Sequence, residues 1–218
     1  MATLLRIDSS PLNGDRSTSR QLTNAFVAEW QAVHPDGVVI TRDLAFTSLP
    51  PVTAGWIAAA YSPEAGLTAE QRQVLAISNE LIAELAAADE YVIGVPMYNF
   101  SIPAVLKLWI DQVARAGKTF TFANGSGAGL LLEKKATFLI ASGGVYAQGT
   151  PGEAMNFVEP YLRAVFAFLG VTNSHFITAG GTSRIRNGGD RETLLRPALA
   201  SIHARLATAA ESGAVRSW

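Results

Sequence analysis

The sequence predicts an α/β domain built on a doubly wound, five-stranded parallel sheet with the strand order 2-1-3-4-5. Five short apolar runs alternate along the chain with segments of helical periodicity, which is typical of strands joined by crossover helices. Three of these runs are almost continuously apolar, as expected for strands covered on both faces. Five strand–helix units fit one domain of this kind, so we expect a single domain over residues 1–218.

The apolar runs give the five expected strands, which are Thr3–Asp8, Val38–Asp43, Tyr91–Val95, Ala136–Ala141 and Val171–Thr178. Helical spacing of apolar residues, Gly at helix ends and a capping box at Thr68 and Gln71 mark the helices. We expect them at Ser19–Val33, from Thr68 onward, and at Ala104–Ala116, Glu153–Leu169 and Arg191–Ala210.

Two segments interrupt the alternation of strands and helices. Leu44–Leu67 has no clear period, and a loop of that length in a compact domain is usually functional or contains short elements. Thr119–Leu132 predicts a hairpin, with Asn124-Gly125 at its turn and Leu130–Leu132 in its second strand.

The helix expected at Ala104–Ala116 has only one narrow polar row, formed by Lys107, Asp111, Arg115 and the following Lys118. One polar row is too little for an ordinary surface helix. Either neighbouring elements cover the apolar remainder, or the helix lies at a dimer interface.

Composition excludes several classes of function. The net charge is −1, from 17 basic and 18 acidic residues, so there is no electrostatic footprint for nucleic acid or an anionic membrane. The absence of cysteine excludes disulfides, thiol catalysis and Cys-ligated metals, and the three histidines lack metal-ligand spacing. No signal peptide or membrane-spanning run is recognisable, so we expect a cytoplasmic protein with no metal site.

The first strand is followed by a cluster of hydroxyl groups. Ser10 lies directly after the strand, and Ser17, Thr18 and Ser19 lie at the start of the first helix. A helix N-terminus offers free backbone N–H groups and binds anions readily. An ordinary N-cap accounts for one hydroxyl. Several of them together favour a phosphate site.

Two more loops at strand ends have unusual composition. The third strand leads into an aromatic and amide-bearing link, and the fourth ends in a pair of glycines that is either a tight turn or a close approach to a ligand. The strand order brings these loops beside the hydroxyl cluster, where such folds bind ligands. Phosphate donors beside a flat, hydrogen-bonding surface predict FMN. The candidate ring-binding residues are Met97, Tyr98, Asn99, Phe100, Ala141, Ser142, Gly143 and Gly144.

The sequence resembles the FMN-dependent NADH azoreductases and NAD(P)H:quinone oxidoreductases along most of its length. The resemblance rests on Pro96–Phe100, on the helix ending at Asp111–Gly117 with Thr119-Phe120 after it, and on Ser9-Ser10, Ser17-x-Ser19 and Arg42–Leu44. Many members carry Arg and His where this chain has Ser142 and Tyr146.

The resemblance implies a flavodoxin-like homodimer with one FMN per subunit at the interface. In this reading the serines hold the phosphate, and the two later loops contact the flavin. Phe122 and the loop around Trp56 and Tyr61 wall the partner's pocket. NADH or NADPH would supply electrons to quinones, azo dyes or nitroaromatics, and no catalytic side chain is demanded. The alternative is a flavodoxin-like electron carrier with no substrate of its own.

Overall fold

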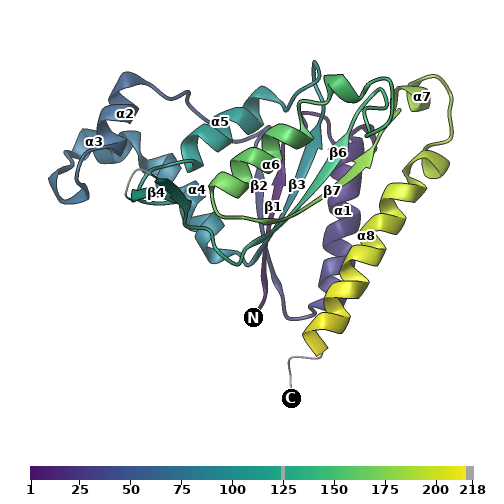
Figure 1. Ribbon diagram of the computed structural model, residues 1–218, viewed down its shortest axis with the longest axis horizontal. Coiled ribbons are helices and arrows are strands. Elements are labelled where there is room, and N and C mark those ends of the chain that lie inside the picture. Colours follow the sequence, from purple (N-terminus) through teal and green to yellow (C-terminus); the bar gives the residue numbers. More distant parts are fainter. Residues whose placement is uncertain (124–125, 215–218) are drawn as a thin grey trace.

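The computed structural model describes residues 1–123 and 126–214, and its centre is a five-stranded parallel sheet (Figure 1). The order of the strands is β2-β1-β3-β6-β7. With the two hairpin strands set aside, this is the predicted order 2-1-3-4-5, so the predicted fold class is confirmed. The strands are β1 (Thr3–Asp8), β2 (Val38–Asp43), β3 (Glu90–Pro96), β6 (Lys135–Ala141) and β7 (Asn173–Ala179).

Burial follows position in the sheet. Every residue of β3 is buried, as are all residues of β6 after Lys135. The edge strands are less buried: no residue of β2 is fully buried, and in β7 only Ile177 and Ala179 are. The bounds of β1 and β2 match the predicted ones residue for residue, whereas β7 begins two residues later than expected, at Asn173.

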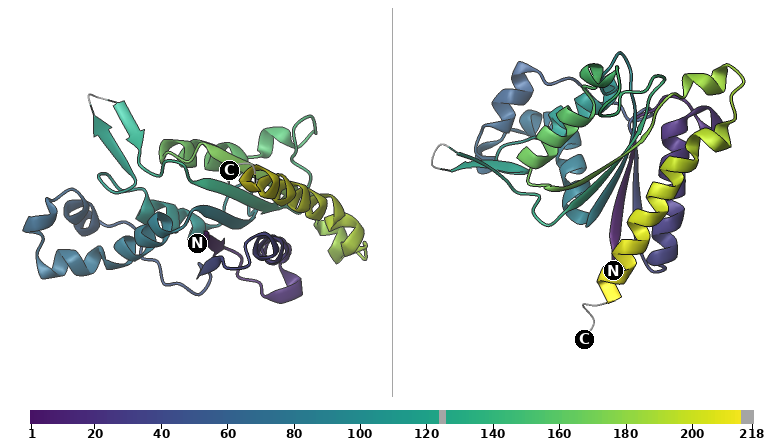
Figure 2. Two further views of the ribbon diagram at one scale, coloured as in Figure 1. Left: turned by 90° about the horizontal axis from the view of Figure 1, so that it is seen from below. Right: turned by 45° about the vertical axis from the view of Figure 1, so that its right-hand side comes forward.

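Helices cover both faces of the sheet. The first helix, α1 (Thr18–Val33), lies beside the last, α8 (Arg191–Ala214), on one face (Figures 1 and 2). The other face carries α4 (Ala76–Ala87), α5 (Ala104–Val113) and α6 (Glu159–Phe168). Each layer of helices buries its own apolar cluster against the sheet. This packing on both faces holds the strand ends, and the loops that follow them, in position.

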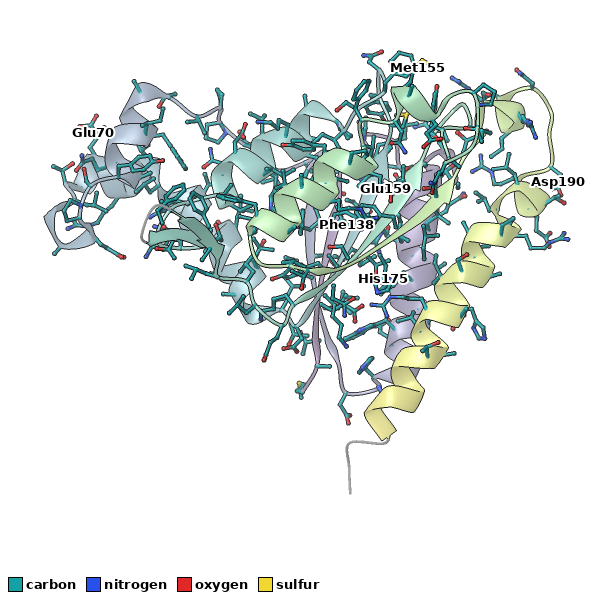
Figure 3. All side chains as sticks on the ribbon, viewed as in Figure 1. Glu70, Phe138, Met155, Glu159, His175 and Asp190 are labelled. Atoms are coloured by element: carbon teal, nitrogen blue, oxygen red, sulfur yellow. The ribbon has the colours of Figure 1, made fainter. Side chains whose placement is uncertain are left out.

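The segment without a clear period forms the start of an arm that extends away from the sheet (Figure 1). It contains α2 (Ala54–Ala60) and the short 3-10 helix η2 (Glu64–Gly66), and α3 (Ala69–Val74) follows. Glu70 marks the far end of the arm in Figure 3. Trp56, Ala59, Leu67 and Leu75 form a small core of its own.

The capping box of Thr68 and Gln71 is confirmed, but the helix that it opens is not continuous. It breaks at Leu75, where α3 ends and α4 begins. Leu75 is buried in the core of the arm, whereas α4 packs against α5 and the sheet. The two helices therefore face different partners, and the bend at Leu75 lets both do so.

The prediction that α5 extends to Ala116 is wrong, because the helix ends at Val113. Thr119 closes it: its hydroxyl donates to the carbonyl of Val113 at 2.6 Å and accepts the N–H of Arg115 at 3.0 Å. Neighbouring elements cover most of its apolar surface, since Trp109 is buried and stacks on Phe166 of α6. This resolves the alternative at Trp109 in favour of packing within the subunit.

The helix expected at Glu153–Leu169 is also shorter than predicted. Residues Glu153–Met155 form only the 3-10 turn η3, and α6 begins at Glu159. The cause is Pro160, which has no N–H and fits the first turn of a helix but not its interior. The side-chain oxygen of Asn156 accepts the N–H groups of Val158 and Glu159 and so satisfies the new start.

The predicted hairpin is present as β4 (Phe120–Ala123) and β5 (Ser126–Gly129), which pair antiparallel and project from the molecule (Figure 2). The second strand ends at Gly129, earlier than predicted. The N–H of Leu130 still donates to the carbonyl of Thr119, whereas that of Leu131 donates to the carbonyl of Leu169 and its side chain joins the core. The predicted turn at Asn124-Gly125 lies outside the described residues. None of the helices in the described part of the chain has the length and hydropathy that crossing a membrane requires.

Candidate functional site

A cleft of about 350 Å³ lies at the carboxyl edge of the sheet, where the loops after β1, β3, β6 and β7 meet. It brings together eight of the predicted site residues, namely Ser10, Ser17, Thr18, Ser19, Met97, Tyr98, Ala141 and Gly143. The other four, Asn99, Phe100, Ser142 and Gly144, belong to the same loops but do not line the cleft. The strand order thus suffices to gather most of the predicted residues in one place.

The hydroxyl cluster forms the floor of one end of the cleft. Ser10, Ser17 and Ser19 are only 2%, 3% and 1% exposed. Ser17 is the N-cap of α1 and accepts the N–H of Arg20 at 3.4 Å, so the capping interpretation holds for this residue. Ser19 has a different role, since the only partner of its hydroxyl among the described residues is the hydroxyl of Ser17, at 3.3 Å. Buried hydroxyls at a helix N-terminus are suited to a phosphate group.

A buried arginine fixes this floor from below. Arg20 donates twice to the carbonyl of Ser10, at 3.1 and 2.6 Å, and forms a two-point ion pair with Asp43 at 2.6 and 2.7 Å. Asp8 lies 3.6 Å from the same guanidinium and also accepts the hydroxyl of Thr23. The hydrogen bonds that Arg20 donates to Asp43 raise the pKa of Arg20 above its ordinary value. Because the carbonyl of Ser10 is held, its hydroxyl has a defined position.

The loop after β3 is a tight turn in a strained conformation. Tyr98 and Ser101 exchange backbone hydrogen bonds of 2.9 and 3.0 Å, with Asn99 and Phe100 between them at φ values of 48° and 70°. Two positive φ angles in succession are typical of a type I′ turn, and a bulky residue pays a steric cost there. Strain of this kind is common at functional sites. Tyr98 and Phe100 are 41% and 42% exposed.

The loop after β6 is held by its carbonyl groups. Thr182 donates to the carbonyl of Ser142 through both its N–H and its hydroxyl, each at 3.0 Å. Ser183 does the same to Gly143, at 3.2 and 2.8 Å. Among the described residues, no acceptor is found for the N–H of Gly143. This donor is therefore available at the cleft.

Aromatic rings link these two loops. Phe100 meets Tyr146 edge to face, with ring centroids 6.0 Å apart. A Cβ atom at Gly144 would lie 2.8 Å from the hydroxyl oxygen of Tyr146, so a side chain at this position would require the tyrosine ring to move. Trp56, expected with Tyr61 and Phe122 to wall the pocket of a partner subunit, is buried in the arm and donates to Gln112 at 2.9 Å. Tyr61 and Phe122 are exposed.

Besides the three predicted loops, the cleft has a fourth wall that was not predicted from the sequence. It consists of Thr182 together with Ile185, Arg186 and Arg191, which belong to α7 (Ser183–Arg186) and the start of α8. Asp190, just before α8, lies at this edge of the molecule in Figure 3. The signal for this wall was the strand order itself, since the loop after the fifth strand must lie beside that after the fourth. Leu12, Arg16 and Pro96 complete the lining.

No cluster of metal-ligating side chains is found among the residues that the structure describes. The site instead offers hydroxyls, backbone N–H groups, arginines and a flat aromatic surface, in one cleft at the carboxyl edge of a parallel sheet. These features define a mononucleotide-binding domain of the flavodoxin-like class.

The chain belongs to the family described as having a flavodoxin-like fold, whose model matches residues 2–206. It is 58% identical over 200 residues to the FMN-dependent NADH:quinone oxidoreductase of Acidobacterium capsulatum, covering 91% of this chain and 96% of that protein. The azoreductase from Bacillus anthracis str. Sterne superposes with a TM-score of 0.85 at 29% identity, covering 94% of this chain and 99% of the other.

A second similar structure is the FMN-dependent NADH-azoreductase from Bacillus anthracis str. Ames Ancestor in complex with FMN. It superposes with a TM-score of 0.85 at 25% identity, and the match covers 96% of this chain and all of the other, 100%. The similarity therefore extends over nearly the whole chain and includes every strand and helix around the cleft.

Proposed function

We propose that the chain is an FMN-dependent oxidoreductase that transfers two electrons from NADH or NADPH to quinones and azo compounds. The observation that carries the proposal is the cleft. The same cleft is lined by the buried serines and by residues of the loops after β3 and β6. The names of the relatives supply the reaction class, since the similar proteins are NADH:quinone oxidoreductases and azoreductases.

The donor set fits FMN. Ser10 and Ser17–Ser19 would hold its phosphate, with help from the free N–H groups of the first turn of α1. Met97–Phe100 and Ala141–Gly144 would hold the ring and the ribityl chain. When bound, FMN supplies the two-electron chemistry, and the protein supplies orientation and exclusion of water.

No side chain is assigned a catalytic role. The N–H of Gly143 would be a donor for negative charge that develops on the bound ring, since Gly143 lines the cleft and Thr182 and Ser183 hold the carbonyl groups of this loop. We infer that the nicotinamide and the acceptor bind in turn at the same place, which is a ping-pong order. Cleavage of an azo bond to two amines then takes two rounds, and nitroaromatics are further candidate acceptors.

We also propose a homodimer with the FMN sites at its interface. Trp109 no longer supports this, because it is buried within the subunit. The support comes instead from large apolar side chains exposed on the hairpin and beside the loop after β3, with exposed fractions of 64% at Phe122 and 58% at Phe157, whose N–H donates to the carbonyl of Phe100. Exposed apolar groups of this size mark interaction surfaces. Light scattering should give a dimer, and Phe122→Glu should weaken it; a wild-type monomer would exclude the interface.

One experiment tests the function. The purified protein should be yellow or take up FMN, and NADH should bleach it in the absence of oxygen. Continued NADH consumption with a simple quinone separates an enzyme from an electron carrier with no substrate of its own. A colourless protein that does not bind FMN would contradict the proposal. We place the reaction in the cytoplasm, where NADH is available.

A further inference from the structure

Three arginines line the cleft, and they come from distant parts of the sequence. Arg16 ends the 3-10 turn η1 (Gly14–Arg16), Arg186 ends α7 and Arg191 begins α8. None of the described residues that line the cleft is acidic. The fold thus gathers three basic side chains in the cleft that the buried serines also line, although the chain as a whole has a net charge of −1.

Five other arginines form ion pairs with carboxylates, namely Arg6, Arg20, Arg42, Arg163 and Arg205. Arg20 is bound to Asp43, and Arg42 is bound to Glu80 and Glu84. Among the described residues, no ion pair joins Arg16, Arg186 or Arg191 to a carboxylate. Arg191 donates to the neutral side chain of Gln21, at 3.0 Å. Like charges at one site repel each other, and an anion bound between them removes the repulsion.

The position of Arg186 depends on the ring-binding loop. Thr182 and Ser183 bind the carbonyls of Ser142 and Gly143, and α7 follows directly. The carbonyl of Arg184 then accepts the N–H groups of Asn187 and Gly189, which closes the turn after α7. Arg186 is therefore attached to a segment that is anchored to the cleft, whereas Arg184 on the same short helix does not line it.

We propose that Arg16, Arg186 and Arg191 form a cationic rim that binds the outward oxygens of the FMN 5′-phosphate and selects FMN over riboflavin by charge. This inference rests on the FMN site proposed above. The serines of the floor are neutral, whereas a phosphate monoester carries about −1.5 to −2 at neutral pH. Guanidinium groups pair with phosphate oxygens at two points, which hydroxyls do not. Floor and rim therefore divide the work: the floor positions the phosphate, and the rim neutralises it.

The rim has a measurable signature because Arg16 and Arg186 are exposed. Exposed charge pairs are weakened by salt, whereas hydrogen bonds from buried serines are not. Each exposed arginine should change the affinity for FMN by about 3- to 10-fold at low ionic strength, and less at high ionic strength. Riboflavin has no phosphate, so its affinity should not respond.

The test compares Arg186→Gln with Arg184→Gln, a matched loss of charge on the same helix. The flavin-free full-length chain is titrated with FMN and with riboflavin, at low and high ionic strength, by the quenching of flavin fluorescence. Arg186→Gln should weaken FMN binding by about 3- to 10-fold at low salt, leave riboflavin binding unchanged and flatten the salt dependence. Arg186→Lys should recover part of the loss, and Arg184→Gln should behave as wild type.

Several outcomes overturn the rim. Equal losses for Arg184→Gln and Arg186→Gln would reflect the general field of the protein, and equal losses for FMN and riboflavin would reflect a structural defect. Unchanged FMN affinity with a raised KM for NADH would assign the arginines to the dinucleotide instead. The proposed function is tested separately. A wild-type chain that binds neither flavin would contradict both the proposed function and the rim. If the wild-type chain binds FMN and is bleached by NADH, the results for the arginine variants bear on the rim alone.

Discussion

At the phosphate end of the cleft, the serines are buried and supported by hydrogen bonds from below, whereas the ring end is an exposed turn in a strained conformation. The contrast is between Ser10, held by Arg20, and Phe100, half-exposed at a φ of 70°. The first end is built before any ligand arrives, so it can supply affinity. The second is open and leaves the identity of the acceptor unrestricted. One ligand site therefore combines a rigid anchor with a permissive working surface.

The largest expected effect comes from breaking the support of the anchor. Arg20→Met would leave Asp8 and Asp43 without their shared partner beneath the phosphate end. Removing one member of a buried ion pair typically costs 3–5 kcal/mol, so we expect the free energy of unfolding to fall by about 3 kcal/mol. Urea denaturation measures it. The control is Lys107→Met, which removes an exposed pair with Asp111 and should cost less than about 0.5 kcal/mol. Similar losses in both variants would show that the network is not a support.

The next effect concerns the anchor itself. Ser19→Ala removes a buried hydroxyl whose only partner within the described residues is Ser17. FMN affinity should fall by about 1.5–3 kcal/mol, roughly 10- to 150-fold, the usual range for a hydrogen bond to a charged group. Binding of riboflavin should stay within twofold of wild type, because the lost partner is the phosphate. Unchanged FMN affinity would remove Ser19 from the phosphate site.

A smaller effect tests the strained end. Phe100→Gly places glycine second in the turn, where the Asn-Gly pair suits a type I′ turn best. Relief of about 1 kcal/mol of backbone strain should exceed the loss of about 0.5 kcal/mol from the contact with Tyr146. We therefore expect the free energy of unfolding to rise by about 0.5 kcal/mol, whereas the rate of quinone turnover should fall.

Glu133→Gly is the matched control for this variant. Glu133 also has a positive φ, of 63°, but it lies outside the cleft. The Glu133→Gly variant should therefore have a higher free energy of unfolding than wild type and the same rate of quinone turnover. If Phe100→Gly turns over quinones like wild type, the strain at the ring end has no functional meaning.

Regular elements of the fold were predictable from the sequence, whereas features set by single side chains were not. The strands were predictable because buried parallel strands are continuous apolar runs, and β1 and β2 matched to the residue. The serines were predictable because helix N-termini need hydroxyls. The wall from α7 was not, since a four-residue helix has no periodicity to detect. The early ends of α5 and α6 were also missed, because they depend on Thr119 and Asn156, whose side chains act on backbone groups outside any regular pattern.

The smallest expected effect concerns the start of α8, which carries Arg191 into the anchor end. Asp190 accepts the N–H groups of Glu192 and Thr193 at 3.2 and 3.0 Å, and its bonds with Thr193 lower the pKa of this carboxyl. A carboxyl with a lowered folded pKa stabilises the fold above its unfolded pKa, and this stability is lost as pH falls through the folded value. Asp190→Asn keeps the hydrogen-bonding shape but removes the charge. Its melting temperature should therefore lie slightly below that of wild type at neutral pH, and the difference should vanish in acid. A difference that persists after the carboxyl has titrated would mean that the shape of this cap, and not its charge, holds the beginning of α8 against the cleft.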